Sequence, residues 1–274
     1  MAHGLEANMK LSFSTLGCPG WSWEDMLSTA KDIGFDGIEI RGIGNELYAP
    51  KAKQFSSENI DITKKKLEKL GLEIPCLTSA SYLFDKANID KHMQEAKDYI
   101  ELASKLGTPF VRVLGDAQPQ PGEVDIDFVI DNLKKLTVIA KEKGVKLLLE
   151  TNGVFAASKV MKEAIEKVQS DSIGVLWDVH HPYRFFNENV DETYENLKNY
   201  ISYVHIKDSL MANDAVKYKM MGYGDIPIKR IVELLKENGF TGYLSLEWVK
   251  RWCLELEEPG IVFSHYAGYM KDLI

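Results

Sequence analysis

The segment from residue 145 to residue 178, VKLLLETNGVFAASKVMKEAIEKVQSDSIGVLWD, contains one complete strand–helix–strand unit. The apolar runs at 145–150 and 173–177 have the composition of strands, and the segment at 157–168 between them has a helical period. The first run ends in Glu150, and Asp178 follows the second directly. The segment therefore predicts a βαβ unit with a carboxylate at the end of each strand.

The same alternation runs along the whole chain. Apolar strand-like runs lie at 11–15, 37–40, 73–78, 110–114, 145–150, 173–177, 203–206 and 243–247. Segments of helical period lie between them at 23–34, 57–71, 90–107, 125–144, 157–168, 190–200 and 226–239. Eight such units in 274 residues predict an α/β fold, a single-domain (β/α)8 TIM barrel.

A doubly wound open sheet is the alternative fold. It normally carries a glycine fingerprint after its first strand, and the sequence TLGCPGWSW at 15–23 is not GxGxxG. Residues 1–8, MAHGLEAN, lack periodicity, and we interpret them as an added leader. The predicted barrel domain therefore spans residues 9–274.

Composition narrows the class of protein and its partners. The net charge of −8 disfavours nucleic acid, since surfaces that follow phosphates are basic. Three widely spaced cysteines indicate a reducing, cytoplasmic compartment rather than a disulfide scaffold. No apolar run approaches the roughly 18 residues of a membrane span. These features predict a cytoplasmic protein without a membrane or nucleic-acid partner, and they leave room for a homo-oligomer.

Polar residues stand at the ends of four successive predicted strands. In a TIM barrel the active site is built at the carboxyl ends of the strands, which lie about 4.8 Å apart. The fifth to eighth strands each bring one metal-competent side chain there: Glu150, Asp178, His205 and Glu247. Three carboxylates and one imidazole suit Mn²⁺ or Mg²⁺ better than a structural Zn²⁺.

Each of these residues also has an ordinary structural explanation. Glu150 could cap the following turn, Asp178 could cap the turn before Pro182, and His205 could be a core histidine. Glu39 and Arg41, after the second strand, could form a simple ion pair at the rim. The repetition at four equivalent positions favours a functional site.

The chain resembles the sugar phosphate isomerase/epimerase superfamily of xylose isomerase-like TIM barrels from about Met9 to its end. The motifs that carry the resemblance are STLGCPGWSWEDML, GFDGIEIRG, LLLETN, WDVHHP, YVHIKD, GYGDIP and GYLSLEW. Similar members include ketose 3-epimerases of the tagatose and psicose type, hydroxypyruvate isomerases, inosose dehydratases and abasic-site endonucleases. The resemblance implies one divalent metal ion bound by Glu150, Asp178, His205 and Glu247. It also implies that His181 contacts the substrate and that the two glutamates act as acid and base.

We therefore predict a metal-dependent isomerase or epimerase of a sugar or polyol. A carboxylate, Glu150 or Glu247, removes a proton next to a carbonyl, and a divalent cation stabilises the resulting enediolate. Mn²⁺ is the expected cofactor, with Mg²⁺, Co²⁺ or Zn²⁺ as alternatives. His181, Lys207 and Arg112 are predicted to bind the substrate, although Lys207 could equally be a solvated loop lysine.

The sequence does not identify a phosphate site. In MGYGDIPIKR at 221–230, Asp225 is expected to cap the next helix, with a phosphate held by the glycines as the weaker alternative. The basic residues near the predicted rim show no cluster along the sequence: Arg41, Arg112, Lys207, Lys219, Lys250 and Arg251.

Three other functions compete with this prediction. A lyase of the inosose dehydratase kind would expel a β-hydroxyl group from the same enediolate. An abasic-site endonuclease would need more histidines, but the third predicted strand ends at Thr78 and the loop after the seventh has none. A non-catalytic sugar-binding barrel would have no use for two candidate bases beside a metal.

Overall fold

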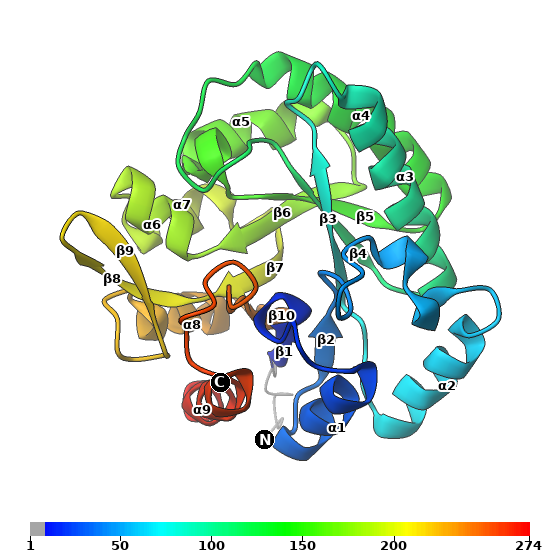
Figure 1. Cartoon of the computed structure of the whole chain (residues 1–274). Coiled ribbons are helices and arrows are strands. Elements are labelled where there is room, and N and C mark those ends of the chain that lie inside the picture. Colours follow the sequence, from blue (N-terminus) through cyan, green and yellow to red (C-terminus); the bar gives the residue numbers. More distant parts are fainter. Residues whose placement is uncertain (1–8) are drawn as a thin grey trace, which may run out of the picture.

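Eight parallel strands close into a barrel in the computed structural model, which describes residues 9–274 (Figure 1). The strand order is β2-β1-β10-β7-β6-β5-β4-β3, and isolated bridges from Gly37 to Glu73 and from Ile40 to Leu77 complete the ring. The barrel strands are β1 (Lys10–Ser14), β2 (Gly37–Glu39), β3 (Cys76–Tyr82), β4 (Phe110–Leu114), β5 (Lys146–Glu150), β6 (Ile173–Asp178), β7 (Ile201–Ile206) and β10 (Tyr243–Leu246). The leader expected at residues 1–8 lies outside the described residues.

Helices follow the strands and surround the barrel (Figure 1). They are α1 (Trp23–Ile33), α2 (Ile60–Leu70), α3 (Ile89–Leu106), α4 (Ile126–Glu142), α5 (Ser158–Val168), α6 (His180–Phe186), α7 (Val190–Leu197), α8 (Ile228–Glu237) and α9 (Pro259–Lys271). Short 3-10 helices lie at η1 (Thr15–Gly17), η2 (Ala49–Lys51), η3 (Lys53–Phe55) and η4 (Gly153–Ala156). The predicted (β/α)8 barrel is confirmed.

Local signals explain where the helices start and stop. In α1, Ser22 and Asp25 form a reciprocal capping box, which satisfies backbone N–H groups at the start of the helix. Gly34 ends α1 with φ +82°, a left-handed conformation that a side chain disfavours. Predicted and observed helix ends therefore agree closely here.

On each barrel strand, every second side chain points into the barrel, and these side chains fill the interior in layers. The residues Cys76, Leu148, Leu176, Tyr203 and Tyr243 form a small buried cluster separate from the main core. Residues two positions later on the same strands point to the same side, because side chains alternate along a strand. Glu150, Asp178 and His205 therefore stand one layer above Leu148, Leu176 and Tyr203.

The third strand is longer than predicted. It runs past Thr78 to Tyr82, with a shift in register against β4. The extension contains small polar residues, so it lacks the apolar run that predicts a strand. Ser79 donates to the carbonyl of Arg112 at 2.7 Å, and Ser81 donates to that of His92 at 2.8 Å. The extension places Tyr82 at the mouth of the barrel.

Two further elements were not predicted. Asp178 leads directly into α6 rather than into an open turn. After β7, an antiparallel hairpin of β8 (Asp208–Ala212) and β9 (Ala215–Lys219) projects beside α6 (Figure 1). Its turn residues Asn213 and Asp214 both have positive φ, as in a tight hairpin turn. The hairpin strands mix polar and apolar residues, and only Asp208 and Ser209 in them are buried, so no apolar run of strand length revealed them.

No helix in the described part of the chain combines the length and the apolar character needed to cross a bilayer. The three cysteines are free, with Cys18 and Cys76 buried and Cys253 partly exposed.

Candidate metal centre and substrate pocket

The four residues predicted from the strand ends come together at the carboxyl end of the barrel. Glu150 and Asp178 end β5 and β6, His205 lies in β7, and Glu247 follows β10. One ligand atom from each lies within 4.8 Å of those of the other three, and all four residues are buried. The predicted convergence is therefore present in the structure.

The carboxylate of Glu39, at the end of β2, orients the histidine. The Nε2 of His205 lies 2.9 Å from Glu39 Oε2, and the hydroxyl of Ser245 donates to the same oxygen at 2.7 Å. Because Nε2 donates to Glu39, the lone pair of the neutral imidazole is on Nδ1, which faces the other three residues. The ion pair of Glu39 with Arg41 considered from the sequence is wrong, since Glu39 is bound to His205 instead.

The donor set fits a divalent metal ion. His205 Nδ1 is buried and has no hydrogen-bond partner. It lies 3.9 Å from Glu150 Oε1, 3.9 Å from Asp178 Oδ2 and 3.5 Å from Glu247 Oε1. Three carboxylates around one unpartnered imidazole nitrogen form a donor set that suits a divalent cation.

Asp178 serves two structural purposes at once. Its Oδ1 accepts the backbone N–H of His180 at 2.9 Å, at the start of α6. Its Oδ2 faces His205 Nδ1 and the ammonium group of Lys207, which is 2.7 Å away. The capping contact considered from the sequence is thus present, and it fixes the orientation of the second oxygen toward the cluster.

Lys207 is a buried part of the site. Its side chain is 2% exposed, and its Nζ pairs with both Asp178 Oδ2 and Glu247 Oε2. Burial alone lowers the pKa of Lys207, but Asp178 and Glu247 outweigh burial and raise it well above the ordinary value. The alternative of a solvated loop lysine is wrong.

The two glutamates have different electrostatic surroundings. Burial raises the pKa of Glu150 to about 7, although Arg112 opposes this effect. Burial also acts on Glu247, but the charges of Lys207 and His205 hold the pKa of Glu247 below its usual range. Without a metal ion, one glutamate therefore holds a proton more readily than the other.

His181 presents one free ring nitrogen to the site. Its Nδ1 donates to the carbonyl of Thr151 at 2.8 Å, and its Nε2 lies 3.5 Å from Asp178 Oδ2. Burial lowers the pKa of His181 to about 4, so the ring is neutral near pH 7 and Nε2 can accept a hydrogen bond. Its neighbour His180 is also buried and contacts Ser209 Oγ at 2.9 Å.

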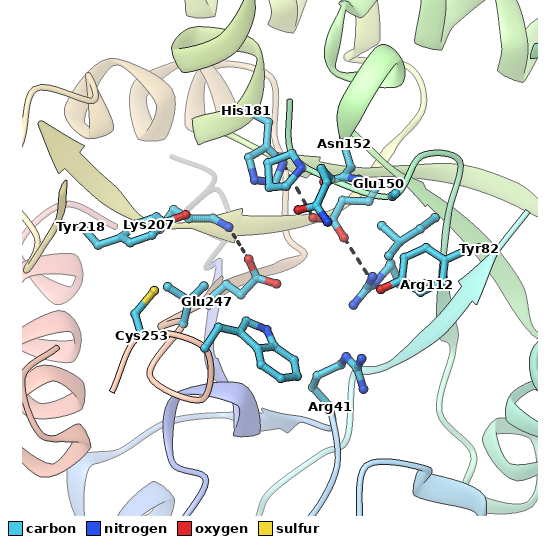
Figure 2. A pocket seen from close by; sticks show the side chains of 16 residues that line it. Arg41, Tyr82, Arg112, Glu150, Asn152, His181, Lys207, Tyr218, Glu247 and Cys253 are labelled. Atoms are coloured by element: carbon cyan, nitrogen blue, oxygen red, sulfur yellow. Dashed lines mark hydrogen bonds and ion pairs between the residues drawn. The ribbon is translucent and has the colours of Figure 1, made fainter. Parts of the chain in front are cut away.

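A pocket of about 380 Å³ opens above these residues. Arg41, Arg112 and Tyr82 lie on one side of it, and Lys207 and Tyr218 lie on the other (Figure 2). Glu150 and Glu247 stand between the two sides (Figure 2). This size and mixture of polar groups are typical of small-molecule sites.

The basic residues that appear scattered in the sequence divide into two groups in the structure. Arg41, Arg112 and Lys207 line the same pocket. In contrast, Lys250 pairs with Glu258, and Arg251 donates to the carbonyl of Gly44. The fold therefore brings three of the six residues to one pocket, with Lys207 on the side opposite Arg41 and Arg112 (Figure 2).

The glycine loop at 221–226 surrounds a carboxylate of the chain itself. Backbone N–H groups of Gly222, Gly224 and Ile226 donate to Asp208 at 2.9–3.2 Å. These donors are therefore already satisfied without a phosphate. Asp225 does not cap α8, which begins after Pro227; it pairs with Arg184 instead.

Sequence reasoning missed the roles of Glu39, Arg41 and Tyr82. Glu39 ends β2 at the rim, a position equivalent to those of Glu150 and Asp178, so strand-end placement could have identified it. Arg41 and Tyr82 face the pocket, but nothing in the sequence shows where these long side chains point.

Curated relatives cover nearly the whole chain. Fructoselysine 3-epimerase of Escherichia coli O157:H7 is 25% identical over 260 residues, which cover 90% of this chain and 93% of that protein. Inosose dehydratase of Clostridium perfringens strain 13 is 21% identical over 283 residues, with 88% of this chain and 90% of that protein covered. The similarity therefore includes the barrel and its rim.

Solved structures share the fold. A xylose isomerase-like TIM barrel protein from Mycobacterium smegmatis, in complex with magnesium, superposes with a TM-score of 0.75 at 20% identity. The match covers 97% of this chain and 96% of that chain. The family model described as xylose isomerase-like TIM barrel matches residues 27–264. The chain belongs to the xylose isomerase-like TIM barrel family.

Proposed function

We propose that the protein is an isomerase or epimerase of a sugar or sugar-like polyol that depends on one divalent metal ion. The observation that carries the proposal is the convergence of ligand atoms of Glu150, Asp178, His205 and Glu247 within 4.8 Å of one another, beside a pocket that Glu150 and Glu247 line. The similarity to a fructoselysine 3-epimerase supports the same reaction class.

Glu150, Asp178, Glu247 and His205 Nδ1 would hold the metal ion. A divalent ion there would supply Lewis-acid stabilisation of negative charge on the carbonyl and neighbouring hydroxyl oxygens of a substrate. The oxygen-rich donor set favours Mn²⁺, with Mg²⁺, Co²⁺ and Zn²⁺ as weaker alternatives. Glu39 fixes the histidine tautomer that the ion requires.

The two glutamates supply the proton transfers in this proposal. Glu150 ends β5 and Glu247 follows β10, and both stand between the two sides of the pocket (Figure 2). In an epimerisation, one carboxylate takes the proton from the carbon next to the carbonyl, and the other returns a proton to the opposite face. In an isomerisation, a single carboxylate moves the proton between adjacent carbons.

Three neighbouring side chains bind and orient the substrate. Lys207 donates to a substrate oxygen, and the neutral ring of His181 accepts from a hydroxyl group through Nε2. Arg112 Nε lies 3.3 Å from Glu150 Oε2, so it holds that glutamate in place at the edge of the pocket. These contacts fix which carbon faces the two carboxylates.

A dehydratase is the second candidate, because inosose dehydratases are among the relatives. The same proton abstraction would then be followed by loss of a β-hydroxyl group as water. The mass of the product separates the two reactions, since only dehydration changes it.

Proton exchange in D₂O tests the proposal without knowledge of the natural substrate. The protein is stripped with a chelator, reloaded with Mn²⁺ and incubated with a panel of ketohexoses, ketopentoses, ketose phosphates, keto sugar acids, inososes and hydroxypyruvate. We expect NMR to show metal-dependent exchange of a proton next to the carbonyl in at least one compound, with rearranged product. Exchange that is equal in stripped and loaded protein, or absent with the whole panel, would contradict the proposal.

A further inference from the structure

Two arginines line the same side of the pocket (Figure 2). Arg41 follows β2 and Arg112 lies in β4, and both face the cavity near Tyr82 (Figure 2). Burial lowers the pKa of Arg41, and the positive charge of Arg112 lowers it further. Glu150, Glu247 and Glu39 raise the pKa of Arg112, so the positive charge that lacks a close carboxylate in this partly buried site is that of Arg41.

These two arginines differ from the other three in the chain. Arg184 donates to the carbonyl of Ser209, Arg230 to Asp191 and Arg251 to the carbonyl of Gly44. Within residues 9–274, neither Arg41 nor Arg112 donates a side-chain hydrogen bond, and the Nε of Arg112 is buried without a hydrogen-bond partner. Arg112 is only 5% exposed, so water does not readily replace the missing acceptors.

The carboxylates of the chain do not compensate both charges. Arg112 has an ion pair with Glu150, which also belongs to the candidate metal centre. Glu95 attracts Arg41 at longer range, but its Oε1 accepts the backbone N–H of Ala80 at 2.6 Å. In the described part of the chain, no carboxylate oxygen lies within 4.0 Å of a guanidinium nitrogen of Arg41.

We infer that Arg41, Arg112 and Tyr82, here called the arginine corner, bind an anionic group of the substrate. This inference deepens the proposed function and rests on it, since it concerns the same pocket. A guanidinium group offers planar paired donors that match the oxygens of a carboxylate or a phosphate. The substrate class is then a sugar acid or a sugar phosphate, whose anionic end lies away from Lys207 and whose reacting carbons lie between Glu150 and Glu247.

Binding of polyols tests the corner independently of turnover. Glucitol is the neutral probe, and glucitol 6-phosphate and gluconate are the anionic probes; none has an aldehyde or ketone group, so none can undergo the proposed reaction. Affinities are measured by calorimetry with and without Mn²⁺, because an anionic group can also ligate the metal. We expect at least one anionic probe to bind at least tenfold more tightly than glucitol, both with and without Mn²⁺. The anionic probe that binds more tightly shows whether the corner takes a phosphate or a carboxylate.

Variants of Arg41 show whether the corner causes the preference. We expect Arg41→Gln to lower the ratio of anionic to neutral affinity at least tenfold, and Arg41→Lys to retain part of it because the charge remains. Lys141→Gln is the matched control, since this exposed lysine near the end of α4 loses the same charge outside the pocket. Circular dichroism and thermal unfolding confirm that each variant is folded.

The outcomes separate this inference from the proposed function. Equal affinity for neutral and anionic probes, or a preference that survives Arg41→Gln, overturns the arginine corner. If ketoses still exchange their protons in that case, the proposed function stands alone. If the preference depends on Arg41 but no sugar in the panel exchanges, the corner stands and the isomerase proposal fails.

Discussion

His205 Nε2 lies 2.9 Å from the carboxylate of Glu39, so the histidine of the candidate centre is oriented by a residue 166 positions earlier in the chain. Both side chains are fully buried. Removal of the charge of Glu39 should weaken the basicity and the alignment of His205 Nδ1. We expect Glu39→Gln to lower Mn²⁺ affinity 10–100-fold, measured by competition with a fluorescent chelator.

Glu68→Gln serves as the control for this variant, because Glu68 is an exposed carboxylate on α2. It should bind Mn²⁺ as the unmodified protein does. An unchanged affinity in Glu39→Gln would mean that the carboxylate does not act through the histidine.

Metal affinity should depend on pH. Burial lowers the pKa of His205, but Glu39, Glu247 and Glu150 together raise it to about 9. Between pH 7 and 9 a metal ion must therefore displace one proton, so the apparent affinity should rise about tenfold per pH unit. The pKa of Glu150 is raised to about 7, so this carboxylate is also protonated below pH 7. The apparent metal affinity should therefore change more steeply with pH there. Calorimetry in buffers of different ionisation enthalpy counts the released protons, and release of none across this range would contradict the assignment.

The two glutamates should be required for turnover as well as for binding. In Glu150→Gln and Glu247→Gln the amide oxygen can still ligate, but no basic carboxylate remains. We expect the rate at saturating Mn²⁺ to fall at least 100-fold in each variant, the typical range for a general base. Steady-state rates at increasing Mn²⁺ provide the test. If both variants reach near-normal rates at saturation, the glutamates are ligands only and the base is another residue.

Asp178→Asn should behave differently. Asp178 contributes one oxygen to the centre and uses the other to cap α6, and it has no proton-transfer role in this account. We expect weaker metal binding, with a large part of the rate restored by excess Mn²⁺. A rate loss as deep as that of the glutamine variants at saturating metal would place Asp178 in the chemistry.

The barrel and the convergence of the four metal-competent residues could be predicted, because both follow from the order of strands and helices along the sequence. Apolar strands alternate with helices, and strand ends in a TIM barrel share one rim, so Glu150, Asp178, His205 and Glu247 had to lie near one another. The extension of β3 to Tyr82 could not be predicted from hydrophobicity, since its serines satisfy neighbouring carbonyl groups rather than filling the core.

The surroundings of the four residues depend on side-chain directions that no pattern encodes. Lys207 follows β7 and could have pointed to solvent, yet it pairs with Asp178 and Glu247 in the interior. Arg41 follows β2 and Arg112 lies 71 positions later in β4, which is not adjacent to β2, and only the closed barrel brings the two residues to one pocket. The partner of Glu39 was misassigned for the same reason, because sequence proximity suggested Arg41 whereas the fold supplies His205.

The most direct test of the central claim is an anomalous difference map from crystals of the protein soaked in Mn²⁺, recorded at the manganese edge. The account predicts one strong peak within coordination distance of Glu150, Asp178, Glu247 and His205 Nδ1, with Lys207 no longer bridging Asp178 and Glu247. A peak elsewhere in the molecule, or none at these four side chains under saturating Mn²⁺, would contradict it.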